Sequence, residues 1–131
     1  MYKRQSPTDL RAVILSILSW IEDDGAAVPP RTDPRYSTIA EAVRGSARTL
    51  AELAPGQSVE VRIPPFVAVQ CVEGPRHTRG TPPNVVQTDP HTWLRLVTGQ
   101  ERWADVAPPR LSASGSRAGE IAHWLPIVPA N

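Results

Sequence analysis

The sequence has very little cysteine and almost no net charge. Its one cysteine, Cys71, has no partner for an internal disulfide. Lysine and arginine together number 14 against 13 acidic residues, a formal net charge of +1. With so little charge and no dense basic run, the chain lacks the electrostatic attraction that draws proteins to a phosphate backbone. We therefore expect no nucleic-acid partner.

Long apolar runs are also missing. The longest, residues 12–21, is interrupted by Ser16 and Ser19 and has about half the length that a bilayer span requires. The amino terminus lacks the basic segment, the uninterrupted apolar run and the small-residue cleavage site of a secretory signal. The expectation is a cytoplasmic protein with no membrane span.

Known catalytic and metal-binding motifs are absent too. His77, His91 and His123 are far apart in the sequence, which does not match the ligand spacing of metal sites. Neither a Gly-Lys-Ser/Thr phosphate loop nor a Gly-x-Ser-x-Gly nucleophile elbow occurs. We expect no metal, no cofactor and no enzymatic activity.

The length of 131 residues suits a single domain over residues 1–131, and the order of its elements suits an α+β fold. Strand 66–72 is rich in apolar and β-branched residues and is expected to be more central than strand 59–63. The elements are predicted from residue pairs that cap helices, from the hydrophobic period, and from glycines and proline pairs that end elements. The first half of the chain is expected to contain a helix from Ser6-Pro7 to Gly25, an extended connection, a helix over 34–53 and strands over 59–63 and 66–72. The second half is expected to contain a strand over 85–88, a helix from Asp89-Pro90 to Gly99, a turn around 103–106, a strand over 111–114 and a helix over 118–125.

The first helix is amphipathic and has a second apolar face. Its main stripe consists of Leu10, Val13, Ile14, Ile17, Leu18 and Ile21. Leu15 and Trp20 lie off that stripe. They are covered either by the rest of the domain or by a partner chain.

The four tryptophans are the most informative apolar residues. Three of them, Trp93, Trp103 and Trp124, fall in the last third of the chain on short helical pieces around one strand. Such a set either fills a core or lines a cavity for an apolar ligand, and the spacing is compatible with both.

The long connection over residues 73–84 contains the one concentrated polar cluster, Arg76, His77 and Arg79. Two guanidinium groups and an imidazole can hold a carboxylate or a phosphate head group. The alternative is a solvated loop tip.

The carboxy-terminal part carries a composite motif. It reads Asp-Pro-x-x-Trp-Leu-x-Leu-x-x-Gly over 89–99, then Trp-Ala at 103–104, Leu-Ser-Ala-Ser-Gly-Ser-Arg-Ala over 111–118 and Trp-Leu-Pro over 124–126. This arrangement resembles the sterol carrier protein family. With segments 59–71 and 77–86 it is similar to the family's small actinobacterial branch. The resemblance covers about residues 34–128, so residues 1–33 are an added amino-terminal helix and linker.

The resemblance implies a curved, mostly antiparallel sheet of about five strands covered by helices. In many members this fold encloses an apolar tunnel for a sterol, a fatty acyl chain or a phospholipid, and no catalytic residues come with it. From the chemistry of their side chains, and not from the resemblance, we expect Arg76, His77 and Arg79 to contact the head group of such a ligand. The implied cavity wall consists of Phe66, Val69, Trp93, Leu94, Val97, Trp103, Trp124 and Leu125.

The expected function is therefore non-enzymatic binding of a lipid or another apolar ligand. The alternative is a sterol-carrier-like fold with a filled or reduced cavity that acts as a protein interaction module, including a homodimer through the amino-terminal helix.

Overall fold

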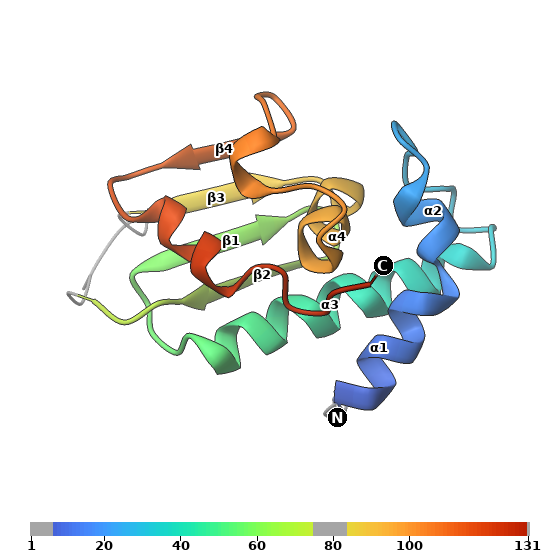
Figure 1. The fold of residues 1–131 in the computed structure, drawn as a ribbon, viewed down its shortest axis with the longest axis horizontal. Coiled ribbons are helices and arrows are strands. Elements are labelled where there is room, and N and C mark those ends of the chain that lie inside the picture. Colours follow the sequence, from blue (N-terminus) through green and yellow to red (C-terminus); the bar gives the residue numbers. More distant parts are fainter. Residues whose placement is uncertain (1–6, 75–83, 131) are drawn as a thin grey trace.

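The computed structural model describes residues 7–74 and 84–130. Each predicted helix and strand forms regular structure, and the order of the elements along the chain follows the expected α+β pattern (Figure 1). The elements are α1 (Pro7–Ser16), α2 (Leu18–Glu22), α3 (Arg35–Leu53), β1 (Val59–Ile63), β2 (Val67–Cys71), β3 (Val85–Thr88), α4 (Pro90–Thr98), the 3-10 helix η1 (Trp103–Asp105), β4 (Leu111–Ser114) and the 3-10 helix η2 (Ala118–Trp124).

The strands form one mixed sheet in the order β2-β1-β3-β4. Pairs β1–β2 and β3–β4 are antiparallel, whereas β1 and β3 are parallel. The described residues thus contain four strands rather than about five, and the sheet is less antiparallel than expected. Strand β3 runs opposite to β2, the strand that precedes it in the chain, but pairs with the free side of β1, so it is parallel to β1.

The expectation that the second strand is the more central one is wrong. β1 lies between β2 and β3, and β2 is an edge strand. The apolar residues of β2 alternate with exposed Ala68 and Gln70, and Val67 and Val69 are only half-buried. Its composition therefore reflects one face packed on α3, not a position in the middle of the sheet.

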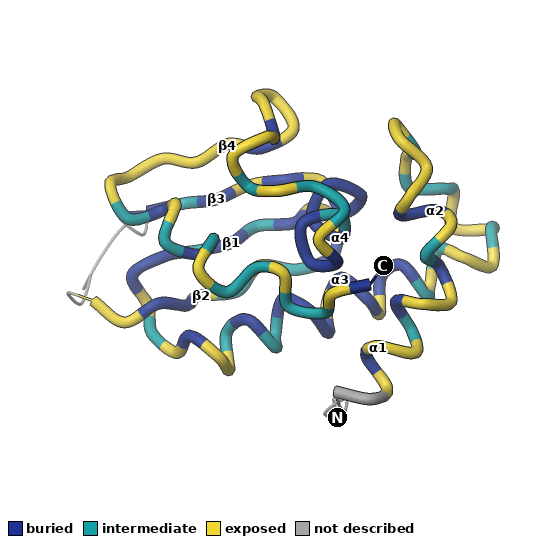
Figure 2. The backbone as a smooth tube through the Cα atoms, viewed as in Figure 1, coloured by how far each residue is buried: buried dark blue, intermediate teal, exposed yellow. Residues whose placement is uncertain are grey.

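Among the described residues, helices cover one face of the sheet and leave the other uncovered. On β1, Val59, Val61 and Ile63 have no exposed surface, while Glu60 and Arg62 form an ion pair on the opposite face. This alternation is the period of a strand with one buried face. Figure 2 shows the buried stretches of β1, β3, α3 and α4 converging on one interior.

The predicted amino-terminal helix is divided in two at Ile17, between α1 and α2. The hydroxyl of Ser16 donates to the carbonyl of Val13 at 2.6 Å, and the Ile17 amide bonds three residues back, to Ile14, at 3.1 Å. Such local side-chain bonds compete with the regular helical pattern. The apolar stripe nevertheless continues through both pieces, and Gly25 has the expected left-handed backbone, with φ +82°.

Both amino-terminal helices pack at the α4 end of the molecule, α1 against α3 and α2 against α4 (Figure 1). Trp20 is buried and its ring nitrogen donates to the Ala27 carbonyl at 3.1 Å, whereas Leu15 is 43% exposed. The rest of the chain therefore covers one of the two off-stripe residues and leaves the other in solvent. No helix in the described part of the chain is long and apolar enough to cross a bilayer.

Helix α4 begins and ends as predicted. The two carboxylate oxygens of Asp89 accept from the backbone amide and the hydroxyl of Thr92, both at 2.8 Å, and Gly99 closes the helix with φ +84°. Beyond η2, which is a 3-10 helix rather than the expected α-helix, the chain returns to α4 and the amide of Val128 donates to the carbonyl of Val97 at 3.0 Å. Helix α4 is thus held by hydrogen bonds at both ends.

Candidate functional site

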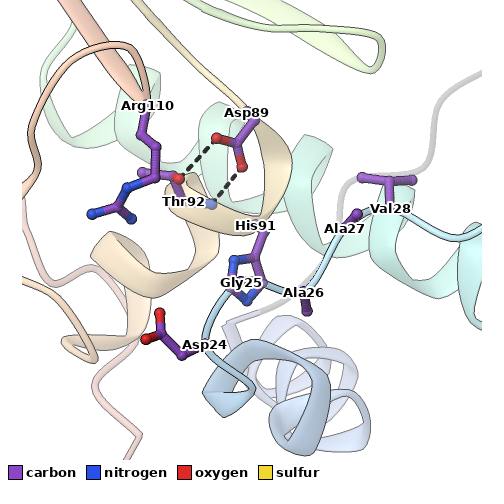
Figure 3. A pocket seen from close by; sticks show the side chains of 9 residues that line it. All are labelled: Asp24, Gly25, Ala26, Ala27, Val28, Asp89, His91, Thr92 and Arg110. Carbon is purple, nitrogen blue, oxygen red and sulfur yellow. Dashed lines mark hydrogen bonds between the residues drawn. The ribbon is translucent and has the colours of Figure 1, made fainter.

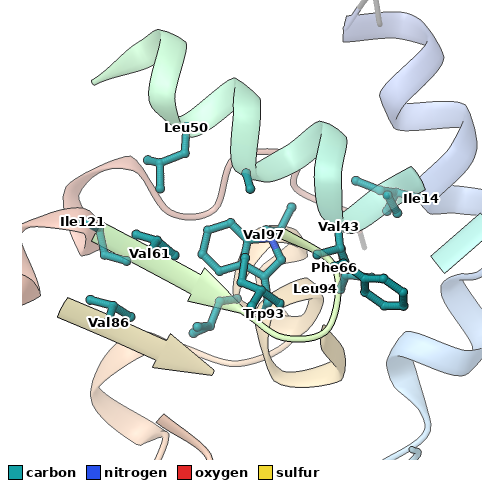
Figure 4. Packing of buried hydrophobic residues seen from close by; sticks show 14 of the residues in the cluster. Ile14, Val43, Leu50, Val61, Phe66, Val86, Trp93, Leu94, Val97 and Ile121 are labelled. Atoms are coloured by element: carbon teal, nitrogen blue, oxygen red, sulfur yellow. The ribbon is translucent and has the colours of Figure 1, made fainter. Parts of the chain in front are cut away.

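Three of the predicted wall residues, Trp93, Leu94 and Val97, lie on the buried side of α4. Each has no exposed surface, so protein atoms enclose it completely. Figure 4 shows Trp93 reaching from α4 into the middle of the interior, with Val61 and Val86 of the sheet nearby. The interior at this position is therefore occupied by an indole ring.

A hydrogen bond fixes that indole ring. The Nε1 atom of Trp93 donates to Oγ of Ser46 on α3 at 2.8 Å. The Ser46 hydroxyl donates in turn to the carbonyl of Ala42 at 2.7 Å, with Val43 as a second acceptor at 3.1 Å. A buried tryptophan normally finds such a partner, and here the partner links α4 to α3 across the core.

The other predicted wall residues are divided between the core and its margin. Phe66 is buried in the turn after β1, where its ring contacts Tyr36 edge-on at 5.3 Å between centroids and the Arg44 guanidinium at 5.6 Å. The remaining four are half-buried hydrophobic residues packed against the core: Val69, Trp103, Trp124 and Leu125.

The predicted head-group residues Arg76, His77 and Arg79 lie outside the described residues. The chain on either side of them is anchored by Arg117, whose guanidinium donates to the Glu73 carbonyl at 2.8 Å. The backbone amide of Arg117 also donates to the side-chain oxygen of Asn84 at 2.9 Å.

A hollow lies outside this interior, between the start of α4 and the segment that follows α2. It has a volume of about 310 Å³. Figure 3 shows its charged and polar side chains coming from three parts of the chain. Its lining consists of Asp24, Gly25, Ala26, Ala27, Val28, Asp89, His91, Thr92 and Arg110.

An ion-pair network holds one side of this hollow. Arg110 donates to both oxygens of Glu101 at 2.7 Å, and Nε of Arg95 donates to Oε1 of Glu101 at 3.0 Å. The bonds from Arg110, and after them those from Arg95, lower the pKa of Glu101 to about 2 despite partial burial. Glu101 is thus a carboxylate at neutral pH, and it fixes Arg110 in place.

Cys71 is a buried residue of β2, next to the core. Burial raises the pKa of its thiol to about 11. Because the thiolate is the reactive form, this cysteine is chemically inert at neutral pH.

Sequence patterns did not identify Ser46, Asp24 or Arg110 as site residues. Ser46 could have been noticed as a hydroxyl on the apolar face of α3, three residues after Val43 and four before Leu50. Asp24 and Arg110 meet only in the folded chain, and nothing in their local sequences connects them.

The chain was also compared with known proteins. Residues 35–127 match the model of a family described as "Bacterial SCP ortholog", where SCP stands for sterol carrier protein. A comparison with curated proteins gives no match. The matched range includes the strands, α3, α4 and the interior around Trp93, and it leaves α1 and α2 outside. The chain therefore belongs to the bacterial sterol carrier protein ortholog family.

Proposed function

We propose that this protein binds a lipid or another apolar ligand, without catalysis, in the interior between α3, α4 and the sheet. Family membership supports a carrier role at the level of the family. That membership is the observation that carries the proposal. In this chain Trp93 fills the centre of the interior and is fixed there by one hydrogen bond, so it is the side chain that a ligand would have to move.

A ligand that enters this interior must displace Trp93. Moving a tryptophan side chain into water exposes about 150–250 Å², which costs about 4–6 kcal/mol at about 25 cal/mol per Å². An acyl chain of about sixteen carbons gains about 13 kcal/mol on burial at about 0.8 kcal/mol per methylene. A long-chain lipid can therefore offset the displacement, whereas a short apolar molecule cannot.

The proposal is tested by titrating palmitate into the purified protein and following Trp fluorescence, together with native mass spectrometry of the loaded sample. Replacing Ser46→Ala removes the bond that keeps Trp93 in place. Since a hydrogen bond contributes about 1 kcal/mol, palmitate should bind about fivefold more tightly to this variant.

Thr49→Ala is the matched control. Thr49 also lies on α3 and donates to a backbone carbonyl, that of Gly45, at 2.8 Å. Its removal should leave palmitate binding unchanged. Absence of saturable binding in both the wild type and Ser46→Ala would rule out the carrier function.

A filled core is the second candidate, and the complete enclosure of Trp93, Leu94 and Val97 favours it. In that case the protein acts through its surface, as a homodimer formed by the amino-terminal helix. Leu15, 43% exposed on α1, is the residue that such a dimer would cover. Sedimentation should then show a dimer that Leu15→Ser converts to a monomer, while Leu53→Ser, at a 55% exposed position on α3, has no effect. A wild-type monomer at high concentration contradicts this candidate.

A further inference from the structure

The hollow between α2 and α4 joins a part of the chain that precedes the family match to a part that lies inside it. Its residues 24–28 precede the family match over 35–127, whereas Asp89, His91 and Arg110 lie inside that match. The amino-terminal addition thus supplies one wall of a pocket whose other walls belong to the family domain. Its volume of about 310 Å³ is at the lower end of the range of about 300–1,000 Å³ for small-molecule sites.

His91 provides the pocket with a hydrogen-bond acceptor. The residue is only 6% exposed, and its Nε2 atom lies 3.2 Å from the carbonyl oxygen of Trp20. Because a carbonyl oxygen can only accept, the proton of the neutral ring is on Nε2, and Nδ1 carries a lone pair.

The Nδ1 atom has no hydrogen-bond partner among the residues that the structure describes. The Trp20 ring packs edge-on against the imidazole, at 4.9 Å between centroids, and restricts its orientation. In Figure 3 the ring projects from α4 toward the 24–28 segment, with Asp24 and Arg110 both to one side of it. An oriented lone pair without a partner on a pocket-lining side chain is a site for a hydrogen-bond donor.

The charges of the lining select a cation rather than an anion. Asp24 and Asp89 contribute two carboxylates against the single guanidinium of Arg110. Arg110 is already paired with both oxygens of Glu101. Each carboxylate oxygen of Asp89 accepts one bond from Thr92 and keeps a second lone pair. Asp89 also occupies the position at the start of α4 where an anion would otherwise bind.

The remaining lining is apolar and small. Ala26, Ala27 and Val28 offer methyl groups beside the acceptors. We propose that this pocket binds a small primary ammonium compound, with its charged head between His91 Nδ1 and the carboxylates of Asp24 and Asp89, and its short alkyl part against residues 26–28. This site is separate from the interior around Trp93, so it does not depend on the proposed lipid function.

The test uses n-butylammonium chloride as the probe and sodium n-butyrate as its anionic counterpart at equal ionic strength. Binding is followed by NMR, from the ¹⁵N shifts of the His91 ring and the backbone amides of residues 24–28. The proposal expects saturable shifts with n-butylammonium and none with n-butyrate. Equal or tighter binding of n-butyrate, or no saturable shift with either probe, overturns it.

Two neighbouring exposed residues give a matched pair of variants. Asp24→Asn removes a carboxylate of the pocket and should weaken n-butylammonium binding about twofold to fivefold. Asp23→Asn removes the same charge from the adjacent residue, which does not belong to the lining, and should change binding by less than about twofold. Equal weakening by both variants would show general charge attraction and overturn the site.

Discussion

The packed interior and the polar pocket of this fold differ in the interactions that hold them together. The interior between α3, α4 and the sheet is apolar and is filled by Trp93, with one hydrogen bond to Ser46. The pocket between α2 and α4 is polar, and its shape depends on capping bonds and an ion-pair network around Asp89 and Glu101. Packing therefore dominates in the interior, whereas hydrogen bonds and ion pairs dominate around the pocket. Three substitutions separate these contributions.

The largest effect is expected from Trp93→Ala. Removing a fully buried tryptophan should destabilise the protein by about 3–5 kcal/mol, since its packing is lost and a cavity is left. Urea denaturation measures the change. Trp103→Ala, at a half-buried position, is the control and should cost clearly less. Equal costs for the two variants would mean that Trp93 does not hold the interior closed.

A smaller and pH-dependent effect is expected from Glu101→Gln. At neutral pH the loss of its charged hydrogen bonds to Arg110 and Arg95 should cost about 1–2 kcal/mol. The pKa of Glu101 is about 2 in the folded protein against an ordinary value of 4.5. Its stabilisation is therefore complete above about pH 4.5 and is lost as the pH falls toward 2.

Urea denaturation of the wild type and Glu101→Gln between pH 2 and pH 7 tests this dependence. The difference between them should disappear at the acid end, whereas the deficit of Trp93→Ala should persist, because neither Trp93 nor Ser46 titrates. A Glu101→Gln deficit that stays constant down to pH 2 would contradict the ion-pair assignment.

The smallest effect is expected from Asp89→Ala, which removes the cap of α4. Such a cap contributes about 1 kcal/mol. Thermal unfolding monitored by circular dichroism measures the change, with Thr92→Val as the comparison. That variant keeps the backbone bond to Asp89 and loses only the bond from its hydroxyl, so it should cost less than Asp89→Ala. The opposite ranking would show that the cap does not fix the start of α4.

Local signals in the sequence predicted the elements well. The beginning of α4 at Asp89-Pro90 and its end at Gly99 depend on bonds within a few residues, so the sequence pattern contains them. The break at Ile17 was missed because an apolar stripe continues through it, although Ser16 provides the competing hydroxyl. The edge position of β2 was missed because apolar composition reports burial of a face and not the order of strands.

The polar pocket could not have been predicted in the same way. The bond from His91 to the Trp20 carbonyl spans 71 residues, and the bond from Arg95 to the Ile21 carbonyl spans 74. No periodic pattern connects positions at such separations. The role of Trp93 was only partly predictable, since its place on the inner side of α4 follows from the motif but its hydrogen bond to Ser46 requires the position of α3.

Helix α2, in the segment before the family match, is held to the family domain by hydrogen bonds to its backbone. These bonds do not depend on which side chains α2 carries. His91 and Arg95 hydrogen-bond the backbone carbonyls of Trp20 and Ile21, and carbonyls are the same whatever side chain they accompany. The packing of α2 on the family domain thus requires a particular course of the backbone and apolar side chains, but no particular polar side chains. Substitutions on the solvent-facing side of α2 should therefore leave both hydrogen bonds to the family domain intact.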